Sequence, residues 1–379
     1  MFQKNKLKIL QVVPVLAYGG VEKIVVNYYN HLNHDEYEFD FISHGKSSPY
    51  VEQLKSDGCN IYEVETIGAL GYIGYKKQVA KIIDINKYDV IHIHIGHITG
   101  IYAKVFRDLG AKKIICHAHT TKCVNTKHRV FMPVFRWFAN NYSDHRLSCS
   151  IMAGDFCFGK RKYELLNNAI DYRKFENVGE GDVNSLKCEL GLQTTPFVIG
   201  HIGHFSKPKN HPYVVKIIEK YHSVYPNAKF VLVGDGPDRQ IIEKEIQGKS
   251  LEDFVIFTGI RQDIPVFMKM FDVFILPSLH EGLPVVSIEA QSSGTDCILS
   301  DKIDFSLDIG LRLTHFLPLK KSCDEWINMI ESIRKQGRKS IDSLRIHKAL
   351  VDSGYDVAAT AEHLEQIYRR IVEDNENGV

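Results

Sequence analysis

The sequence predicts an α/β protein with two doubly wound parallel sheets. Short runs rich in Val, Ile and Phe recur along the chain, with stretches of helical character between them. These runs are continuously apolar rather than alternating, which is typical of parallel strands that helices cover on both faces. At 379 residues, with 44% hydrophobic and 25% charged residues, the chain is also too long for one ordinary core, so we expect two domains.

The first domain is predicted over residues 1–172. Its first strand, KILQVV at 8–13, lies near several lysines and imitates a signal peptide. Because Gln11 and Pro14 interrupt the apolar run, a buried strand is the better interpretation. The further strands predicted in this domain are FDFIS at 39–43, NIYEV at 60–64, DVIHIH at 89–94, KKIICHAH at 112–119 and RLSCS at 146–150.

The second domain is predicted over residues 196–355. Residues 173–195 are polar and hold no strand candidate, so we assign them to a linker. A fresh series of strands then begins: FVIGHIG at 197–203, KFVLVGDG at 229–236, FVIFTG at 254–259, VFILPS at 273–278 and DCILSD at 296–301.

A last helix is predicted at residues 356–379, with Asp356 as a plausible N-cap. Its helical spacing places five apolar residues on one face: Val357, Ala361, Leu364, Tyr368 and Ile371. We expect this face to dock on the first domain.

Composition excludes several classes of protein. The 47 Lys and Arg residues nearly balance the 46 Asp and Glu residues, which argues against a dedicated nucleic-acid binder. The eight cysteines form no Cys-x-x-Cys pair of the kind that zinc and redox sites use, and they suggest a reducing, cytoplasmic environment. No apolar run approaches the roughly 18 residues that would span a bilayer.

The stretch FDVFILPSLHEGLPVVSIEA, at residues 271–290, predicts a phosphate site. A buried strand ends at Pro277, and a helix begins near Pro284, since proline suits the first helical position. A helix N-terminus favours a phosphate through its dipole and its unpaired N–H groups. The N–H groups expected there belong to residues around Gly282, Leu283 and Val285.

Two carboxylates bracket this site. Glu281 precedes the helix and Glu289 lies one turn beyond Val285, so the two can reach different parts of one ligand. One could accept hydrogen bonds from ribose hydroxyls and the other could hold sugar hydroxyls. The alternative is that Glu281 only complements the helix dipole and Glu289 is a solvated surface residue.

These residues resemble the Glu-x7-Glu motif of the retaining glycosyltransferases of family four. That family has the GT-B architecture, in which two Rossmann-like domains face an interdomain cleft. The resemblance continues in order through LAYGGVEKIV at 16–25, CHAHTT at 116–121, LLNNAIDYRKF at 165–175, IGHFSKPKNH at 202–211, LVGDGP at 232–237 and SSGTDCILSD at 292–301. The likeness is closest to bacterial enzymes that build exopolysaccharide or capsule units.

The resemblance implies a reaction and its substrates. A hexosyl or N-acetylhexosaminyl group would pass from a nucleotide diphosphate donor, UDP being the expected carrier, to a lipid-linked saccharide with retention of configuration. Gly19 and Gly20 match the family's glycine-rich turn, although an ordinary strand-to-helix turn would also explain them. His119 matches a histidine that contacts the transferred sugar, whereas we interpret His92 and His94 as packing residues.

One position departs from the family pattern. Lys209 matches the lysine that neutralises the leaving diphosphate, but His204 stands where an arginine is usual. Fixed cations at the leaving group are a main source of catalysis in such a site, so a permanent charge is missing unless His204 is protonated. A non-catalytic partner subunit is therefore an alternative, and a nucleotide-sugar epimerase on a related fold is another.

No cofactor or metal is expected. The metal-dependent transferases hold a divalent ion with an Asp-x-Asp pair, and Asp301, Asp304 and Asp308 do not match that spacing. We therefore expect the protein to bind the diphosphate without a metal.

A basic and aromatic segment suggests contact with a membrane. Residues 104–136 hold eight Lys or Arg and one acid, Asp108, and run into VFMPVFRWF at 130–138. Such a segment could lie in the interface of an anionic membrane on its cytoplasmic face. A solvated basic face beside a core helix explains the same residues.

Overall fold

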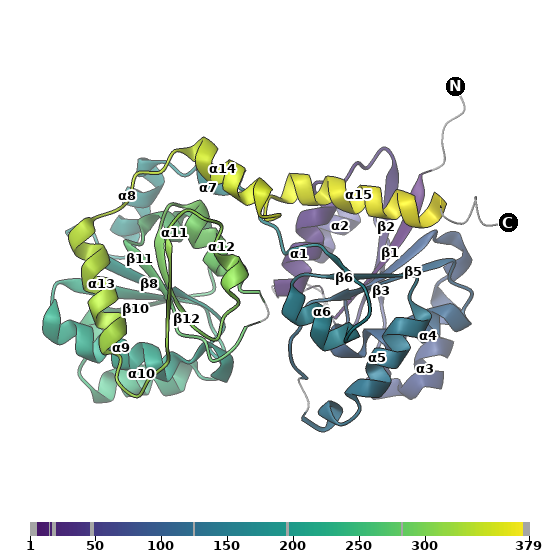
Figure 1. Cartoon of the computed structure of the whole chain (residues 1–379), viewed down its shortest axis with the longest axis horizontal. Coiled ribbons are helices and arrows are strands. Elements are labelled where there is room, and N and C mark those ends of the chain that lie inside the picture. Colours follow the sequence, from purple (N-terminus) through teal and green to yellow (C-terminus); the bar gives the residue numbers. More distant parts are fainter. Residues whose placement is uncertain are drawn as a thin grey trace. The chain divides into compact units, whose positions relative to one another are not determined.

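The computed structural model describes residues 6–14, 16, 20–45, 49–123, 126–194, 197–281 and 283–373. The chain divides into two compact units, which are Met1–Ala169 with Val357–Val379, and Ile170–Asp356. Each unit is a parallel sheet with helices on both faces, and this confirms the predicted fold class (Figure 1).

The first unit holds a seven-stranded sheet among its described residues, in the order β3-β2-β1-β4-β5-β6-β7. Its strands are β1 Leu7–Val13, β2 Tyr37–Ser43, β3 Ile61–Glu63, β4 Val90–Ile93, β5 Lys113–Ala118, β6 His145–Ser148 and β7 Glu164–Leu165. Every neighbouring pair is parallel. The chain winds outward from β1 to β3 and then returns to β4 beside β1, so the topological switch lies between β1 and β4.

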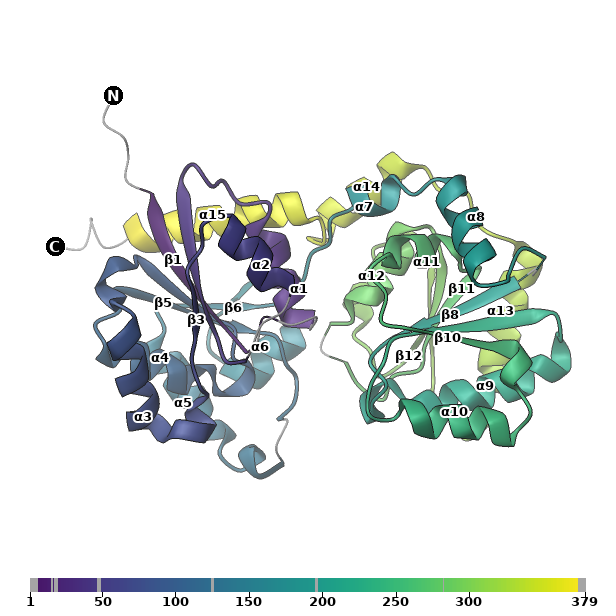
Figure 2. The ribbon, with the colours of Figure 1, turned by 180° about the vertical axis from the view of Figure 1, so that it is seen from behind.

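Helices cover both faces of this sheet. Figures 1 and 2 show α3 to α5 on one face and α1, α2 and α15 on the other. The helices are α1 Gly20–Tyr29, α2 Pro49–Ser56, α3 Ile67–Ile82, α4 Thr99–Asp108, α5 Met132–Tyr142, α6 Ile151–Phe158 and α15 Val357–Glu373. The 3-10 turns are η1 Ile85–Lys87, η2 Gly96–Ile98 and η3 Thr126–Arg129.

The second unit holds a six-stranded sheet among its described residues, in the order β10-β9-β8-β11-β12-β13. Its strands are β8 Phe197–Ile202, β9 Ala228–Val233, β10 Val255–Gly259, β11 Val273–Leu276, β12 Asp296–Ser300 and β13 Thr314–Leu317. The central strands β8 and β11 are buried along their whole length, as their continuous apolar runs predict. The switch in this sheet lies between β8 and β11.

The helices of the second unit also form two layers. Figures 1 and 2 show α9, α10 and α13 on one face and α7, α8, α11, α12 and α14 on the other. They are α7 Arg173–Glu176, α8 Glu180–Glu189, α9 His211–Val224, α10 Arg239–Gly248, α11 Ile264–Met270, α12 Val285–Ser292, α13 Asp324–Gln336 and α14 Ser343–Asp352. The 3-10 turns are η4 Lys207–Lys209, η5 Glu252–Phe254 and η6 Phe305–Leu307.

The boundaries differ from the sequence prediction at one segment. Most of the residues assigned to a linker, 173–195, form α7 and α8 and belong to the second unit, where both helices contact α11. The polar composition that suggested a linker reflects helices that expose most of their surface. The last helix, α15, belongs to the first unit and packs beside α1, with all five residues of the predicted apolar face buried.

Candidate active site

A lysine and a carboxylate meet at the switch point of the second unit, where the loops after β8 and β11 lie side by side. Lys209 Nζ lies 2.7 Å from Glu281 Oε1. The same carboxylate oxygen accepts a hydrogen bond of 2.7 Å from Ser278 Oγ. Both partners of the ion pair are mostly buried, with side chains 17% and 14% exposed, so the pair is shielded from solvent screening. Ligands of open α/β sheets bind at this position.

Hydrogen bonds between the two loops hold this pair in place. Asn210 Nδ2 donates to the Pro277 carbonyl at 3.0 Å, and the Leu279 N–H donates to the Pro208 carbonyl at 2.8 Å. Asn210 adopts a left-handed conformation with φ of 59°, which asparagine tolerates better than most residues. Lys209 is therefore fixed to the loop that carries Glu281. Both ends of the ion pair were predicted from the sequence, whereas Ser278 and Asn210 were not.

Helix α12 follows directly from this loop. It begins at Val285, with Pro284 as its N-cap, so the proline lies one position earlier than the first helical residue that we predicted. Leu283 is buried, whereas Gly282 lies outside the described residues. The first N–H groups of a helix have no intrahelical partner, and they give this end a partial positive charge.

Glu289 lies on α12 and is only 3% exposed. Its alternative interpretation as a solvated surface residue is therefore wrong. Burying a carboxylate is costly unless it has partners, so a buried glutamate one turn into this helix indicates a structural or binding requirement.

A glycine turn completes this edge of the sheet. At Gly234, with φ of 132°, an added Cβ would lie 2.1 Å from the Gly203 carbonyl oxygen. At Gly236 it would lie 2.5 Å from the Phe205 carbonyl oxygen and 2.9 Å from His204 Cε1. Only glycine permits this contact between the backbones that follow β8 and β9. His204 is exposed beside this turn.

Arg239 was not anticipated from the sequence. This first residue of α10 sends its guanidinium to the same sheet edge, where Nη1 donates to the Gly234 carbonyl at 3.4 Å and Nε pairs with Glu243 at 2.7 Å. It adds a permanent positive charge near the turn that carries His204.

The first unit places its candidate residues at the carboxyl ends of β1, β4 and β5. Gly20 begins α1 and is exposed, and a Cβ there would meet no atom within 4 Å. Gly19, its predicted partner in the turn, lies outside the described residues. His119 follows β5, and its Nε2 lies 2.9 Å from His94 Nδ1.

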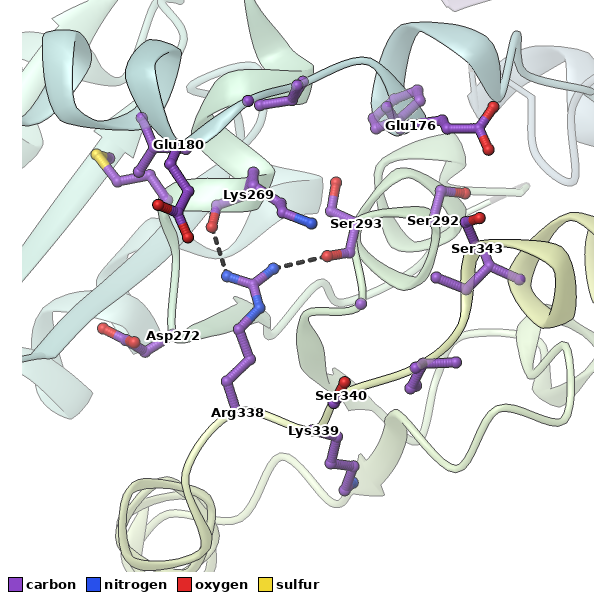
Figure 3. A pocket seen from close by; sticks show the side chains of 18 of the residues that line it. Glu176, Glu180, Lys269, Asp272, Ser292, Ser293, Arg338, Lys339, Ser340 and Ser343 are labelled. Carbon is purple, nitrogen blue, oxygen red and sulfur yellow. Dashed lines mark hydrogen bonds between the residues drawn. The ribbon is translucent and has the colours of Figure 1, made fainter.

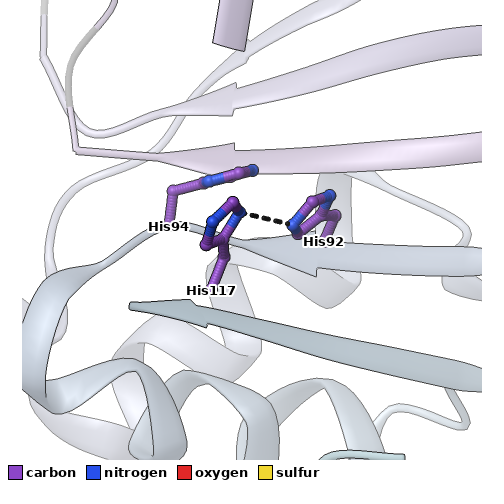
Figure 4. A group of neighbouring side chains, drawn as sticks. All are labelled: His92, His94 and His117. Carbon is purple, nitrogen blue, oxygen red and sulfur yellow. Dashed lines mark hydrogen bonds between the residues drawn. The ribbon is translucent and has the colours of Figure 1, made fainter. Parts of the chain in front are cut away.

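His119 belongs to a cluster of histidines. His92, His94 and His117 are buried, and Figure 4 shows their rings close together with a hydrogen bond of 3.2 Å between His92 Nε2 and His117 Nδ1. One ring nitrogen of each of these three histidines lies within 4.8 Å of those of the other two, which is a spacing that a metal site would require. Nitrogens of these rings also bond to each other and to protein side chains.

Burial controls the charge of this cluster. It lowers the pKa values of His92, His94 and His117 well below the ordinary value of histidine. His119 is partly exposed at the rim, but dense protein surroundings still lower its pKa to about 4, and Asn168 offsets part of that fall. All four imidazoles are therefore neutral at physiological pH.

The chain matches two family models that together cover most of its length. Residues 18–171 match the model described as Glycosyltransferase Family 4, and residues 182–309 match the model described as Glycosyl transferases group 1. The chain belongs to glycosyltransferase family 4. It is an enzyme that transfers sugars.

Relatives and solved structures agree with this assignment. The glycosyltransferase is 31% identical to EpsF, a Bacillus subtilis (strain 168) protein assigned to the glycosyltransferases, over 98% of this chain and 99% of the relative. It is 26% identical to the Escherichia coli UDP-Gal:alpha-D-GlcNAc-diphosphoundecaprenol alpha-1,3-galactosyltransferase, over 96% and 97% of the two chains. The Anabaena Alr3699/HepE structure with UDP and glucose superposes with a TM-score of 0.78, at 18% identity and over 96% and 100% of the chains.

The basic segment of this glycosyltransferase is less charged than its sequence suggested. Lys104 pairs with Asp108 at 2.9 Å, Arg107 with Asp144 at 2.5 Å and Lys112 with Asp89 at 2.9 Å. Two of these acids, Asp144 and Asp89, lie outside residues 104–136, so the charges within that segment alone overstate how basic it is. The apolar part is better exposed: Val130, Phe131, Val134 and Trp137 are 48% to 80% exposed on and before α5.

A cavity of the glycosyltransferase lies elsewhere in the second unit. It has a volume of about 710 Å³ and is lined by residues from α7 and α8, by the segments before β11 and β12 and by residues 338–346 (Figure 3). The segments before β11 and β12 lie at the amino ends of these strands, whereas Lys209 lies at the carboxyl ends. Arg338 reaches across it and donates to the carbonyls of Lys269 and Ser293 and to Thr295 Oγ1. None of the predicted site residues lines this cavity.

Within the described residues, no helix combines the length and apolar character that crossing a membrane requires.

Proposed function

We propose that this glycosyltransferase moves a hexosyl or N-acetylhexosaminyl group from a UDP-sugar to a lipid-linked saccharide, with retention of configuration, in exopolysaccharide or capsule synthesis. The observation that carries the proposal is the Lys209–Glu281 pair at the β8/β11 switch, directly before the N-terminus of α12. This arrangement offers a held cation and helix N–H groups to a diphosphate, beside two carboxylates that suit hydroxyl groups.

The donor diphosphate would bind at the start of α12 and contact Lys209 Nζ. Since that ammonium already bonds to Glu281, a phosphate would share it or displace the carboxylate, which then becomes available to a sugar hydroxyl. Glu289 would accept hydrogen bonds from the ribose. The names of the Escherichia coli relative and the Anabaena structure include UDP-Gal and UDP, which supports UDP as the carrier.

In the proposed reaction, the acceptor oxygen forms a bond to the anomeric carbon while the bond from that carbon to the diphosphate breaks. The leaving oxygen gains negative charge, and the acceptor proton can pass to it. Lys209 and the start of α12 would stabilise this charge without a metal, together with His204. His119 would contact the transferred sugar.

The acceptor would reach the enzyme from a membrane surface. The exposed apolar residues around α5 suit an interface, and the Escherichia coli relative is named for a diphosphoundecaprenol substrate. Because aspartates pair with three of the nearby cations, we propose that apolar insertion contributes more to membrane contact than anionic lipid does.

Calorimetric titration tests the proposed binding of a UDP-sugar without a metal. A panel of nucleotide sugars is titrated into the wild type and into Glu289→Ala, and each titration is repeated with EDTA. We expect a UDP-sugar to bind the wild type equally with and without EDTA, and to bind the variant far more weakly. Binding that disappears with EDTA would contradict metal-free recognition. Binding of another nucleotide in preference would contradict the choice of UDP, and equal binding by the variant would remove the role of Glu289.

Retention is tested separately. The product made from a donor of known anomeric configuration is examined by NMR, and a product with the opposite configuration would exclude the proposed stereochemistry.

A further inference from the structure

Six side chains on one face of the first sheet form a continuous hydrogen-bonded series, which we name the histidine chain. In order, its members are His119, His94, Gln11, Tyr368, His92 and His117, with the following distances between successive polar atoms: 2.9, 2.8, 3.0, 2.8 and 3.2 Å. Strands β1, β4 and β5, the segments after β4 and β5, and helix α15 all contribute to it.

Gln11 gives the chain a direction, because its carboxamide oxygen can only accept and its NH2 group can only donate. The oxygen lies 2.8 Å from His94 Nε2, so that nitrogen must carry a proton. The NH2 group donates to the Tyr368 hydroxyl at 3.0 Å. The tyrosine proton is then directed to His92 Nδ1, 2.8 Å away, which must be unprotonated.

The neutrality of the rings extends this assignment to both ends. A neutral imidazole carries one proton, so His92 has it on Nε2 and donates to His117 Nδ1. By the same reasoning His94 Nδ1 is unprotonated and accepts the proton of His119 Nε2. All four histidines are thus protonated on Nε2. His119 Nδ1 is left with a lone pair. It is buried and forms no hydrogen bond among the described residues, although the Asn168 side chain, whose Oδ1 is likewise unpaired there, lies beside this ring.

We propose that the histidine chain fixes His119 as a hydrogen-bond acceptor for a hydroxyl group of the transferred sugar, with Gln11 and Tyr368 as positioning residues. The proposal rests on the proposed function, in which His119 contacts that sugar. A hydroxyl proton is the group that an unprotonated, buried nitrogen can bind. If the Gln11 carboxamide were rotated by 180°, every hydrogen bond of the histidine chain would reverse its direction and His119 Nδ1 would become a donor. The orientation of one amide group therefore sets whether a nitrogen several hydrogen bonds away donates or accepts.

The protonation pattern can be measured without any substrate. NMR of the full-length protein with ¹⁵N-labelled histidine distinguishes protonated from unprotonated ring nitrogens, and His119→Gln and His117→Gln variants identify the signals. We expect neutral rings with the proton on Nε2 at pH 7 for His92, His94, His117 and His119. A proton on His119 Nδ1 would overturn the proposal, whether or not the enzyme proves to use a UDP-sugar.

A kinetic comparison tests the positioning role. Tyr368→Phe removes the hydroxyl from the middle of the chain and keeps the ring. Tyr37→Phe is the matched control, because Tyr37 is also buried, touches the Tyr368 ring and donates to α15 through the Glu365 carbonyl at 3.1 Å, yet lies outside the chain. We expect Tyr368→Phe to lower kcat/KM about fivefold to tenfold more than the control does.

Monodeoxy donors make the comparison specific. With the donor that lacks the hydroxyl bound by His119, the difference between Tyr368→Phe and wild type should disappear. A loss that is equal in both tyrosine variants, or that persists with every deoxy donor, would assign Tyr368 a structural role only and overturn the proposal. If no UDP-sugar is turned over by the wild type, the proposed function fails, while the NMR measurement still decides the state of His119.

Discussion

Lys209 is paired with Glu281 in the structure, and we propose that the same side chain serves the reaction. Its ion pair with Glu281 satisfies a mostly buried ammonium before any donor arrives. A diphosphate carries more charge than the carboxylate, so it can attract the same cation.

We predict that Lys209→Met lowers kcat by about a hundredfold to a thousandfold, since the leaving group loses a directed cation. Steady-state kinetics with the donor identified by calorimetry measure this effect. The control is Lys220→Met. Lys220 lies on the surface of α9 and pairs with Asp324, and its loss should leave the kinetics as in the wild type. Similar kcat values in the two variants would mean that Lys209 is not needed at the leaving group.

His204 gives the second prediction for a single residue. Arginine carries a permanent charge and a planar fork of donors that matches a phosphate, whereas an imidazole does not. We expect His204→Arg to raise kcat by about tenfold in steady-state kinetics. An unchanged kcat would indicate that Arg239, at the same sheet edge, already supplies the missing charge.

Residues that act locally could be predicted from the sequence, and residues that meet through the fold could not. Glu281 and Glu289 were recognised because a short spacing around one helix places them. The bond between Gln11 and Tyr368 joins residues 357 positions apart, and nothing near either residue suggests it. His92 and His94 were interpreted as packing residues, because a strand pattern shows burial but not hydrogen-bond partners.

Among the secondary-structure elements, the buried strands were predictable and the marginal ones were not. The eleven predicted strands correspond to β1 to β6 and β8 to β12. The missed strands, β7 and β13, lie at sheet edges, have two and four residues and are half-buried or exposed, so they lack the apolar run that marks a central strand. Helices α7 and α8 were missed because their polar composition suggested a linker.

Helix α5 carries a prediction about membrane contact. We expect the double variant Phe131→Ser and Trp137→Ser to lose most sedimentation with vesicles that contain anionic lipid. Raising the salt concentration should weaken wild-type binding only slightly, because part of the basic segment is already paired. Ile241→Ser removes an exposed apolar side chain from α10 and serves as the control. Binding that survives in the double variant, or that salt abolishes, would contradict apolar insertion at α5.

For the protein as a whole, the buried neutral histidines predict sensitivity to acid. Burial lowers the pKa of His201 to about 4 and that of His211 to about 2, whereas both would titrate near 6.5 in an unfolded chain. Below pH 6.5 His201 and His211 become protonated in the unfolded state but stay neutral in the folded state. The free energy of unfolding should therefore be highest above pH 6.5 and fall by about 1.4 kcal/mol per pH unit for each such histidine until its folded pKa is reached.

Urea unfolding of the second unit between pH 7 and pH 5 measures this loss. Trp326 is fully buried in that unit, so its fluorescence in a Trp137→Phe background reports on it alone. His201→Gln should reduce the slope of stability against pH by about one proton. A slope equal to that of the parent would show that His201 does not stay neutral on folding.

The position of α15 has a consequence for how the protein is made. The second unit is one continuous segment, Ile170–Asp356, whereas the first lacks α15 until the residues that follow the second unit are synthesised. On the ribosome the second unit can therefore finish folding while the first still exposes the face around Gln11 and His92. A chain that stopped before Val357 would hold a complete second unit and an open histidine chain, so the first unit can finish folding only after the second has been synthesised.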